Sequence, residues 1–327
     1  MRVTSFLLIV VCVTAGGCER RAQTAGDGQA TGGRPPAMRV VSLAPALTQM
    51  MVDMGQENLL VGVAQHDPFA ATSLPVVGHW QDINTELLLS LRPTHVLTMT
   101  GRRATPLPLL VKLAPSCGFK LVAYRSPLSV SDISQTIFDQ QEPALAADGL
   151  SPRCLGVVLN AMDSAKRLVA QMALELDHVR RVTADLAKPR VLMVIGVNPL
   201  MASGPGTVHD QLLSYCGAQN AAGNATVGAP VYDKERLLEA NPDVVLMLLP
   251  HAVALGPIDT DPRLALFRGL SIEAVKQDRV VLVSDPQVQL TSSGVGRIAM
   301  AMAKAIHPGL APVAADFPLP HPRLQSR

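Results

Sequence analysis

The sequence predicts an α/β fold with two Rossmann-like lobes, each built on a parallel central sheet, and one long α-helix that joins them. Three observations predict this fold. Short apolar runs typical of buried strands alternate with helix-like segments along most of the chain. One segment of the sequence occurs twice. A long stretch with helical periodicity lies between the two copies.

The repeated segment covers residues 84–97 and 233–246. Each copy begins with Asn or Asp, which favours a helix N-cap, and has a glutamate two residues later, Glu86 or Glu235. A leucine-rich turn, a proline and a β-branched run follow, which predicts a helix that ends before the proline and leads into a buried strand. We interpret the copies as equivalent parts of two similar lobes. Two unrelated αβ units that resemble each other by chance are the alternative.

Length and composition limit the classes of protein. A chain of 327 residues with 48% hydrophobic content suits two domains with substantial cores, and an aromatic content of only 3% makes those cores aliphatic. The net charge of +2 and the lack of a basic tract exclude a nucleic-acid-binding surface of the usual kind. The sequence contains no Cys-x-x-Cys pair, P-loop or glycine-rich dinucleotide motif, so no cofactor is expected.

The first 18 residues have the pattern of a secretory signal. An apolar run at Phe6–Val13 follows a short basic start, and it is too short to span a membrane. The segment ends at Cys18 and resembles a bacterial lipoprotein signal, although Ala15 stands where such signals usually have Leu. We therefore expect export, with a lipid on Cys18 that holds the protein on the periplasmic side of a membrane. Residues 19–37 are rich in Gly, Ala, Gln, Thr and Pro and are predicted to form a flexible tether.

The first lobe is expected over residues 39–150. Its strands and helices alternate, which favours a parallel sheet covered on both faces. The expected strands are Arg39–Leu43, Leu59–Val63, Val76–Val77, His95–Met99 and Leu121–Tyr124, and the expected helices besides the repeated segment are Ala46–Met54 and Pro108–Ser116.

The linking segment covers residues 151–188. Within it, apolar side chains recur at steps of three and four over residues 155–186, which predicts one amphipathic helix about 45 Å long. Such a helix is a stiff connection, so we expect small movements between the lobes and a monomeric protein. A coiled-coil helix that forms a dimer is the alternative.

The second lobe is expected over residues 189–316, followed by a Pro-rich tail at 317–327. A glycine-bearing loop at 196–206 precedes a helix that Thr207 can cap. The expected strands besides the repeated segment are Arg190–Ile195 and Val280–Val283, and the expected helices are Val208–Cys216 and Arg297–Ile306.

Several segments together carry a family resemblance: residues 39–48, 77–84, 203–207 and 280–283. In this order they resemble the periplasmic binding proteins for vitamin B12 and iron–siderophore complexes, which are the solute-binding components of ABC importers. The resemblance covers about residues 39–308. It implies a ligand between two lobes joined by one long helix, and delivery of that ligand to a permease dimer in the membrane.

The resemblance also implies a set of ligand-binding residues, nearest to those of the B12-binding branch. Trp80 stands where that branch has a tryptophan in contact with cobalamin, and Pro45 and Asp285 match cleft positions. The implied ligand is a cobalamin-like corrinoid, and an iron–siderophore complex or haem is the alternative within the family. Where the branch has aromatic cleft residues, this chain has His66, Met99, Ile195 and Met201.

Some of these residues have other readings. His66 is a candidate axial ligand to cobalt or haem iron. Met99 and Met201 suit apolar contact with a macrocycle, but they equally suit the filling of a core.

The two repeated glutamates also acquire an implied role. In this family a glutamate on each lobe pairs with arginines of the two membrane subunits, and Glu86 and Glu235 match those positions. The alternative is a favourable interaction of each carboxylate with the dipole of its helix.

Two other kinds of site remain open from the residues alone. His66, His79 and His209, with Asp285, could bind bare zinc or manganese, although their spacing is not that of a local metal motif. Ser203 in the glycine loop and His209 are the types of residue that hydrolases use. The Gly-x-Ser-x-Gly motif is missing, so we read Ser203 as a residue of the loop and helix start and expect no catalysis.

Three cysteines lie in the predicted folded region: Cys117, Cys154 and Cys216. Outside the cytoplasm a pair can be oxidised, and an odd number leaves at least one free or paired between chains. Cys117 and Cys154 both flank the first lobe and are the preferred pair.

Overall fold

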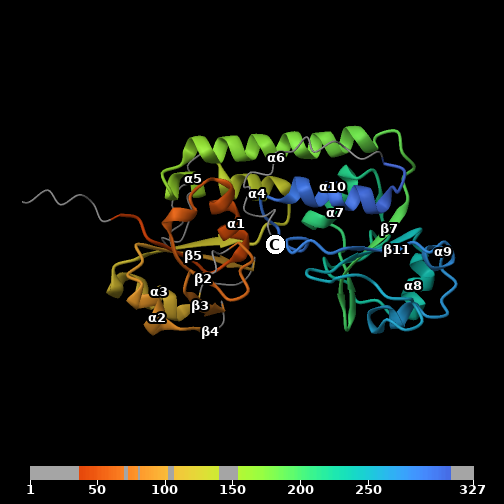
Figure 1. The fold of residues 1–327 in the computed structure, drawn as a ribbon, viewed down its shortest axis with the longest axis horizontal. Coiled ribbons are helices and arrows are strands. Elements are labelled where there is room, and N and C mark those ends of the chain that lie inside the picture. The colour runs from red at the N-terminus through yellow and green to blue at the C-terminus, as the bar shows by residue number, and fades with distance from the viewer. Residues whose placement is uncertain (1–36, 70–72, 80–81, 102–106, 140–153, 311–327) are drawn as a thin grey trace, which may run out of the picture. The chain divides into compact units, whose positions relative to one another are not determined.

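A computed structural model describes residues 37–69, 73–79, 82–101, 107–139 and 154–310 (Figure 1). Cys18, most of the predicted tether, Trp80 and the predicted tail lie outside these residues. Within the described ranges, none of the helices has both the length and the apolar content of a membrane span.

The first sheet has the strand order β4-β3-β2-β1-β5-β6. All its neighbouring strands are parallel except β3 and β4, which pair antiparallel. The expected strands and helices of this lobe are confirmed with small shifts at their ends. The strands are β1 Val40–Ser42, β2 Leu60–Ala64, β3 Val76–His79, β4 Asp82–Ile83, β5 His95–Thr100 and β6 Lys120–Arg125, and the helices are α1 Pro45–Asp53, the 3₁₀ turn η1 Glu57–Leu59, α2 Thr85–Ser90, α3 Pro108–Cys117 and α4 Val130–Ile137.

The second sheet has the order β11-β10-β7-β8, and β9 pairs in parallel with the start of β7. The predicted loop at 196–206 contains β8, which forms an antiparallel hairpin with β7. The expectation of parallel central sheets is therefore confirmed, and each lobe adds one antiparallel pair at an edge, because a short connection permits only antiparallel pairing. The strands are β7 Arg190–Val197, β8 Leu200–Ala202, β9 Gln219–Asn220, β10 Val244–Leu248 and β11 Val280–Val283, and the helices are α7 Val208–Tyr215, α8 Lys234–Ala240, the 3₁₀ turn η2 Pro262–Phe267, α9 Glu273–Lys276 and α10 Val295–Ile306.

The two lobes share one topology. The parallel strands β2-β1-β5-β6 of the first lobe and β9-β7-β10-β11 of the second have the same order relative to the chain. The repeated segment forms α2 and β5 in one lobe and α8 and β10 in the other. The predicted caps are present, because Asn84 accepts from the N–H of Leu87 and Asp233 accepts from that of Arg236, both at 2.9 Å. This agreement supports the interpretation of two equivalent lobes.

The backbone also repeats at the end of each copied helix. Arg92 has φ +45° and Asn241 has φ +34°, and a proline follows each. Proline disfavours the right-handed helical conformation in the preceding residue, so the helix must end here. In both copies the backbone leaves the helix through a residue in the left-handed conformation and enters the next strand, β5 or β10, three residues later.

The predicted single helix over residues 155–186 is wrong. The segment forms α5 Leu155–Val158 and α6 Met162–Thr183, separated by a turn in which Asn160 has φ +53°. Gly156 permits the close packing of the two helices, because a Cβ there would lie 2.8 Å from Cβ of Ala165 and 2.9 Å from Sδ of Met162. The missing side chain lets α5 fold back onto α6. The 22 residues of α6 span about 33 Å.

The helix α6 packs against both lobes. It contacts α4 and α5 on the first-lobe side and α7 and α10 on the second-lobe side, and Figure 1 shows α10 running beside it. Its apolar face, which includes Leu168, Met172 and Leu176, belongs to one core cluster with residues of α1 and α10. The other two core clusters each lie within a single lobe. Burial of each such side chain contributes about 1.5–3 kcal/mol to the stability of the fold. The shared cluster therefore holds the two lobes together by hydrophobic packing.

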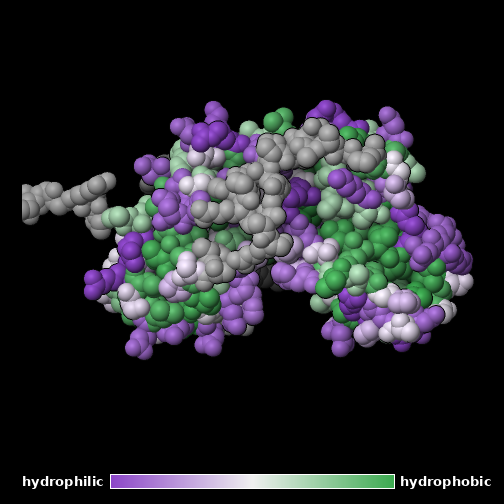
Figure 2. Space-filling model, in the orientation of Figure 1, coloured by the Kyte–Doolittle hydropathy of each residue, from purple (hydrophilic) through white to green (hydrophobic). Residues whose placement is uncertain are grey.

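The outer surface is mixed in character. Figure 2 shows hydrophobic residues reaching the visible face of both lobes among hydrophilic ones. Exposed large apolar side chains include Leu109 and Val111 on α3 and Leu238 on α8. Scattered exposure of this kind is ordinary for folded proteins.

Candidate functional site

The candidate residues of the first lobe lie at one edge of its sheet. Pro45 follows β1 and begins α1, His66 follows β2, and Met99 is the next-to-last residue of β5. These three strands are parallel neighbours, so their carboxyl ends meet at the same edge. In open parallel sheets, ligands bind outside this edge.

The side chains at this edge differ in exposure. His66 is exposed in a turn, with φ +60°. Met99 is half-buried and packs against the large core cluster. Part of the Met99 side chain therefore fills the core, and the rest is exposed at the sheet edge, where a ligand could contact it.

The candidate residues of the second lobe also gather at the carboxyl ends of strands. Ile195 and Gly196 lie near the end of β7, and Met201 of β8 pairs with Gly196. A Cβ on Gly196 would lie 2.8 Å from Cε of Met201, so glycine lets this methionine lie across β7. Asp285 follows β11. Each lobe thus presents its candidate residues at the equivalent sheet edge.

Asp285 has partners within its own chain. Its Oδ1 accepts from the N–H of Gln287 at 2.8 Å, and its Oδ2 pairs with the Arg297 guanidinium on α10. Arg297 also hydrogen-bonds Oε1 of Gln287. The Asp285 carboxylate therefore orients a loop and a helix at the site, a role that its matching position did not predict.

Hydrogen bonds between the lobes connect α1 to the loop before α10. Nε2 of Gln49 donates to Oε1 of Gln287 at 2.7 Å, and both side chains are buried. The Ser292 hydroxyl donates to the carbonyl of Ala46, also at 2.7 Å. The polar run before α10 is visible in the sequence, but nothing local to it indicates that its partners lie in the other lobe.

Gln289 connects two strand ends in the second lobe. Its Nε2 donates to the carbonyl of Ile195 at 2.8 Å and to that of Leu248 at 2.7 Å. These carbonyls belong to neighbouring strands, β7 and β10. The glutamine thus stabilises the edge at which Ile195 lies, and the sequence did not single it out.

A buried carboxyl group, that of Glu175, lies where α6 packs against α10. Glu175 on α6 is buried, and its carboxylate accepts from Nε2 of Gln171 at 2.8 Å. Burial raises the pKa of Glu175; the Gln171 hydrogen bond opposes this, Asp53 adds to it and Arg297 opposes it. A Cβ on the adjoining Gly296 would lie 2.3 Å from Oε2 of Glu175, so only glycine permits this approach of the two helices.

Ser203 and His209 have separate partners. The Ser203 hydroxyl is buried and is hydrogen-bonded to that of Thr207 at 2.9 Å. Nε2 of His209 donates to the carbonyl of Val288 at 2.7 Å, and burial lowers the pKa of His209 while this hydrogen bond opposes the shift. Thr207 caps α7, as predicted. The geometry thus agrees with a structural role for Ser203 at the loop and helix start.

The geometry also bears on metal binding. Among the residues that the structure describes, no group of three or more His, Cys, Asp or Glu side chains is placed to hold a metal ion. His209 is committed to Val288, and Asp285 is paired with Arg297. The side chain of His79 lies outside the described part.

The preferred cysteine pair is wrong. Cys117, Cys154 and Cys216 are all free, the first exposed and the others buried. Cys154 lies at the start of α5, with Sγ 3.8 Å from the carbonyl of Asp139 and 4.0 Å from Sδ of Met162. Two cysteines that flank the same lobe in the sequence need not lie close in space. A disulfide requires close and correctly directed Cβ atoms.

The two repeated glutamates occupy equivalent places. Glu86 is in the first turn of α2 and Glu235 in the first turn of α8, and both are exposed. Their positions fit both readings, because a first-turn carboxylate complements the helix dipole and an exposed one is accessible to a partner.

Comparison with known proteins adds to this geometry. A family model described as periplasmic binding protein matches residues 40–286. A vitamin B12-binding protein of Pectobacterium atrosepticum is 29% identical over 217 residues, which cover 64% of this chain and 71% of that protein. A periplasmic heme-binding protein from Roseiflexus sp. RS-1 aligns with a TM-score of 0.66 and 24% identity over 83% of this chain and 98% of that one. A periplasmic vitamin B12-binding protein of Vibrio cholerae aligns with a TM-score of 0.58 and 22% identity over the same two shares.

Proposed function

This chain belongs to the periplasmic binding protein family, and we propose that its ligand is a cobalamin-like corrinoid bound between the two lobes. It is the solute-binding component of an ABC importer. The observation that carries the proposal is the position of Pro45 and Met99 at the carboxyl edge of the first sheet and of Met201 beside the carboxyl end of β7 in the second. A corrin ring is broad and largely apolar at its faces, which suits contact with methionine, proline and the single tryptophan, Trp80. The similarity to B12-binding relatives supports the same ligand.

Calorimetry with the purified protein tests the ligand. Cyanocobalamin, hemin, a ferric siderophore, Zn²⁺ and Mn²⁺ are titrated separately into ligand-free protein. Saturable one-to-one binding of cyanocobalamin, without turnover, is the expected result. Binding of a siderophore or a bare metal ion with no heat from cyanocobalamin would overturn the ligand while leaving the family assignment in place.

Haem is the second candidate ligand, favoured by a pair of histidines. His66 follows β2 of the first lobe and His251 lies shortly after β10 of the second. Both are exposed, and both have φ +60°. A neutral imidazole is a common axial ligand of haem iron. Hemin titration followed by the Soret band tests this candidate, since His66→Ala and His251→Ala would each change the spectrum if the histidine binds iron.

The partner surface is proposed to include Glu86 and Glu235. Each lobe exposes one carboxylate in an equivalent helical turn, so two contacts would form with the two subunits of a permease dimer. Arginines opposite these carboxylates would make charge-assisted hydrogen bonds. The protein is proposed to act as a monomer, tethered to the membrane by a lipid on Cys18. Mass spectrometry of membrane-extracted protein would detect the acyl groups on that cysteine.

A further inference from the structure

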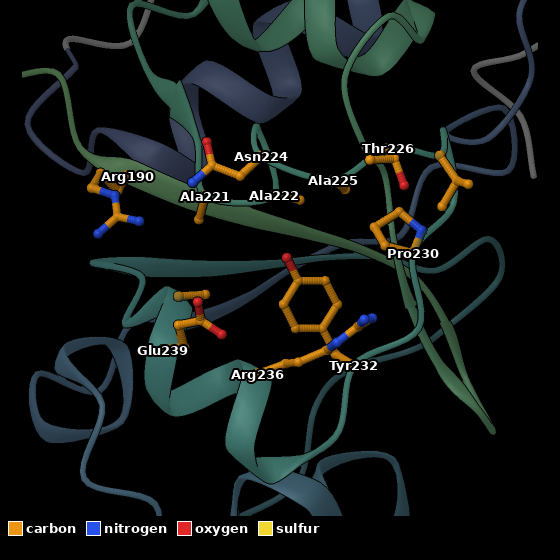
Figure 3. Close-up of a pocket in the computed structure, with 12 residues that line it drawn as sticks. Arg190, Ala221, Ala222, Asn224, Ala225, Thr226, Pro230, Tyr232, Arg236 and Glu239 are labelled. Carbon is orange, nitrogen blue, oxygen red and sulfur yellow. The ribbon is translucent and has the colours of Figure 1, made fainter.

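The second lobe contains a pocket beside its sheet, away from the strand ends discussed above (Figure 3). In the first lobe, β2, β3 and β4 continue the sheet beyond β1. In the second lobe, only the two-residue β9 pairs in parallel beyond β7, and residues 221–233 then run to α8 without a further strand of that series. The pocket occupies the resulting gap, with a volume of ≈ 430 Å³. A volume of this size is typical of small-molecule sites.

The walls of the pocket are held in place by hydrogen bonds. The N–H groups of Ala202 and Gly204 donate to the carbonyls of Pro230 and Gly228 at 2.9 and 2.8 Å, which fixes the loop to β8. The N–H of Ala222 donates to Oδ1 of Asn220 at 2.9 Å at the other end of the loop. The pocket is therefore formed before any ligand arrives, which lowers the entropic cost of binding.

Several polar side chains that line this pocket have no hydrogen-bond or ion-pair partner among the described residues. Among the residues that the structure describes, none forms a hydrogen bond or ion pair with the Arg190 guanidinium, the Glu239 carboxylate or the Tyr232 hydroxyl. Figure 3 shows the Tyr232 hydroxyl directed toward the segment Ala221–Ala225. A second cation, Arg236, is already oriented, because its Nη1 donates to the carbonyl of Val231 at 2.7 Å.

The charged side chains of the pocket all act on the Tyr232 hydroxyl. Burial raises the pKa of Tyr232, Arg236 lowers it, Glu239 raises it and Arg190 lowers it. The phenol oxygen therefore lies within the field of both cations and of the carboxylate. A simple anion would leave Glu239 without a partner, and a simple amine would leave the arginines without one, whereas a ligand that carries both charges can pair with both.

We propose that this pocket is a second ligand site that binds one small zwitterion of the α-amino acid class. Its carboxylate meets Arg190 and the Tyr232 hydroxyl, and its ammonium meets Glu239. Its aliphatic part lies against the apolar wall. That wall is formed by Ala221, Ala222, Ala225, Val227 and Pro230.

The test compares three matched probes by calorimetry at low salt, using the full chain without corrinoid. L-Leucine carries both charges, 4-methylpentanoate lacks the ammonium, and 3-methylbutylamine lacks the carboxylate. Leucine is expected to bind one-to-one, and each analogue is expected to bind at least about tenfold more weakly. An absence of saturable leucine binding, or equal binding of either analogue, would overturn the proposal.

Variants locate the site. Arg190→Gln and Glu239→Gln are each expected to weaken leucine binding at least about tenfold. Lys188→Gln and Glu235→Gln are the matched controls, because both residues are exposed nearby but do not line the pocket. Thermal unfolding confirms that each variant is folded, and the Glu239 variant carries the test if the Arg190 variant is not. Unchanged leucine affinity in folded pocket variants would place any binding elsewhere and overturn the assignment.

The site is independent of the ligand between the lobes. Arg190→Gln is expected to leave cyanocobalamin affinity unchanged, and Met99→Ala is expected to leave leucine affinity unchanged. A loss of both ligands in the Arg190 variant would show a single shared site and contradict the proposal.

Discussion

Gln49 in α1 donates a hydrogen bond of 2.7 Å to Gln287 in the loop before α10, and this bond joins the two lobes through buried side chains. The acceptor atom of Gln287 is also bonded to Arg297, which in turn pairs with Asp285. The middle of helix α1 in one lobe is thereby connected to a candidate ligand residue in the other. The connection does not depend on α6.

Loss of these contacts between the lobes should lower stability. Gln49→Ala and Ser292→Ala are each expected to reduce the free energy of unfolding by about 1 kcal/mol, because each removes a buried hydrogen bond. Urea unfolding measures the change. Gln219→Ala, at an exposed position of β9, is the control and should change the free energy of unfolding by less than about 0.5 kcal/mol. Equal effects of the control and the interlobe variants would remove the special role of these bonds.

Glu175 predicts a pH dependence of stability. Its folded-state pKa lies above the ordinary value of 4.5, so the folded protein holds the proton more tightly than the unfolded chain. Its contribution to stability is therefore present at low pH and is lost as pH rises above that value. Gln171, Asp53 and Arg297 face this carboxyl and tune the shift.

The measurement compares wild type with Glu175→Gln by urea unfolding from about pH 4 to about pH 8. The stability of wild type relative to the variant is expected to fall as pH rises, because the amide does not titrate. A difference that stays constant over this range would show that Glu175 has the same pKa in both states.

Trp80 is expected to contribute directly to corrinoid affinity. Trp80→Ala should weaken cyanocobalamin binding by about 1–3 kcal/mol, which is the loss for a buried aromatic contact. Since this is the only tryptophan in the chain, quenching of its fluorescence gives a second readout in wild type. Leu109→Ala on the exposed face of α3 is the control. Unchanged affinity in the tryptophan variant would remove Trp80 from the site.

The repeated glutamates predict a separation of binding from transport. Glu86→Ala/Glu235→Ala should leave ligand affinity intact and reduce uptake into vesicles that contain the permease. Glu86→Arg/Glu235→Arg should abolish uptake through repulsion between like charges. Asp163→Arg is the matched control, because Asp163 is an exposed acid in the first turn of another helix, α6. Uptake at the wild-type rate by the charge-reversed protein would leave only the helix-dipole role.

Movement between the lobes is expected to be small. The helix α6 packs on both lobes, and one core cluster includes residues from α1, α6 and α10. Small-angle scattering with and without cyanocobalamin should therefore give nearly the same radius of gyration. A large compaction on binding would show that the shared core separates in the ligand-free protein.

Several features of the fold followed from local sequence. The caps at Asn84 and Asp233, the helices that end before a proline and the apolar strands β5 and β10 all result from interactions within a few residues. Patterns that span only a few residues can be recognised in a single sequence, and the repetition of this one at residues 84–97 and 233–246 indicated two lobes. Pro45, His66 and Met99 were candidates only because of the family resemblance, and the structure places them at one sheet edge because they lie at the ends of neighbouring parallel strands.

Other features depended on partners distant in the chain. The break between α5 and α6 lies at a turn containing Asn160, after which α6 packs on Gly156 through Ala165, and an apolar repeat does not reveal such a reversal. The free state of Cys154 follows from its burial beside Asp139 and Met162 rather than from its sequence neighbours.

By itself the sequence determined the α/β class, the two lobes, the helix caps and most of the strands, because each rests on propensity and periodicity over short stretches. Only the tertiary structure decided that Asp285 is paired with Arg297 and that Gln49 meets Gln287. It alone also opened a pocket between Arg190 and Glu239. These relations join residues far apart in the chain, and their formation depends on how the sheets and helices pack, which no local pattern encodes.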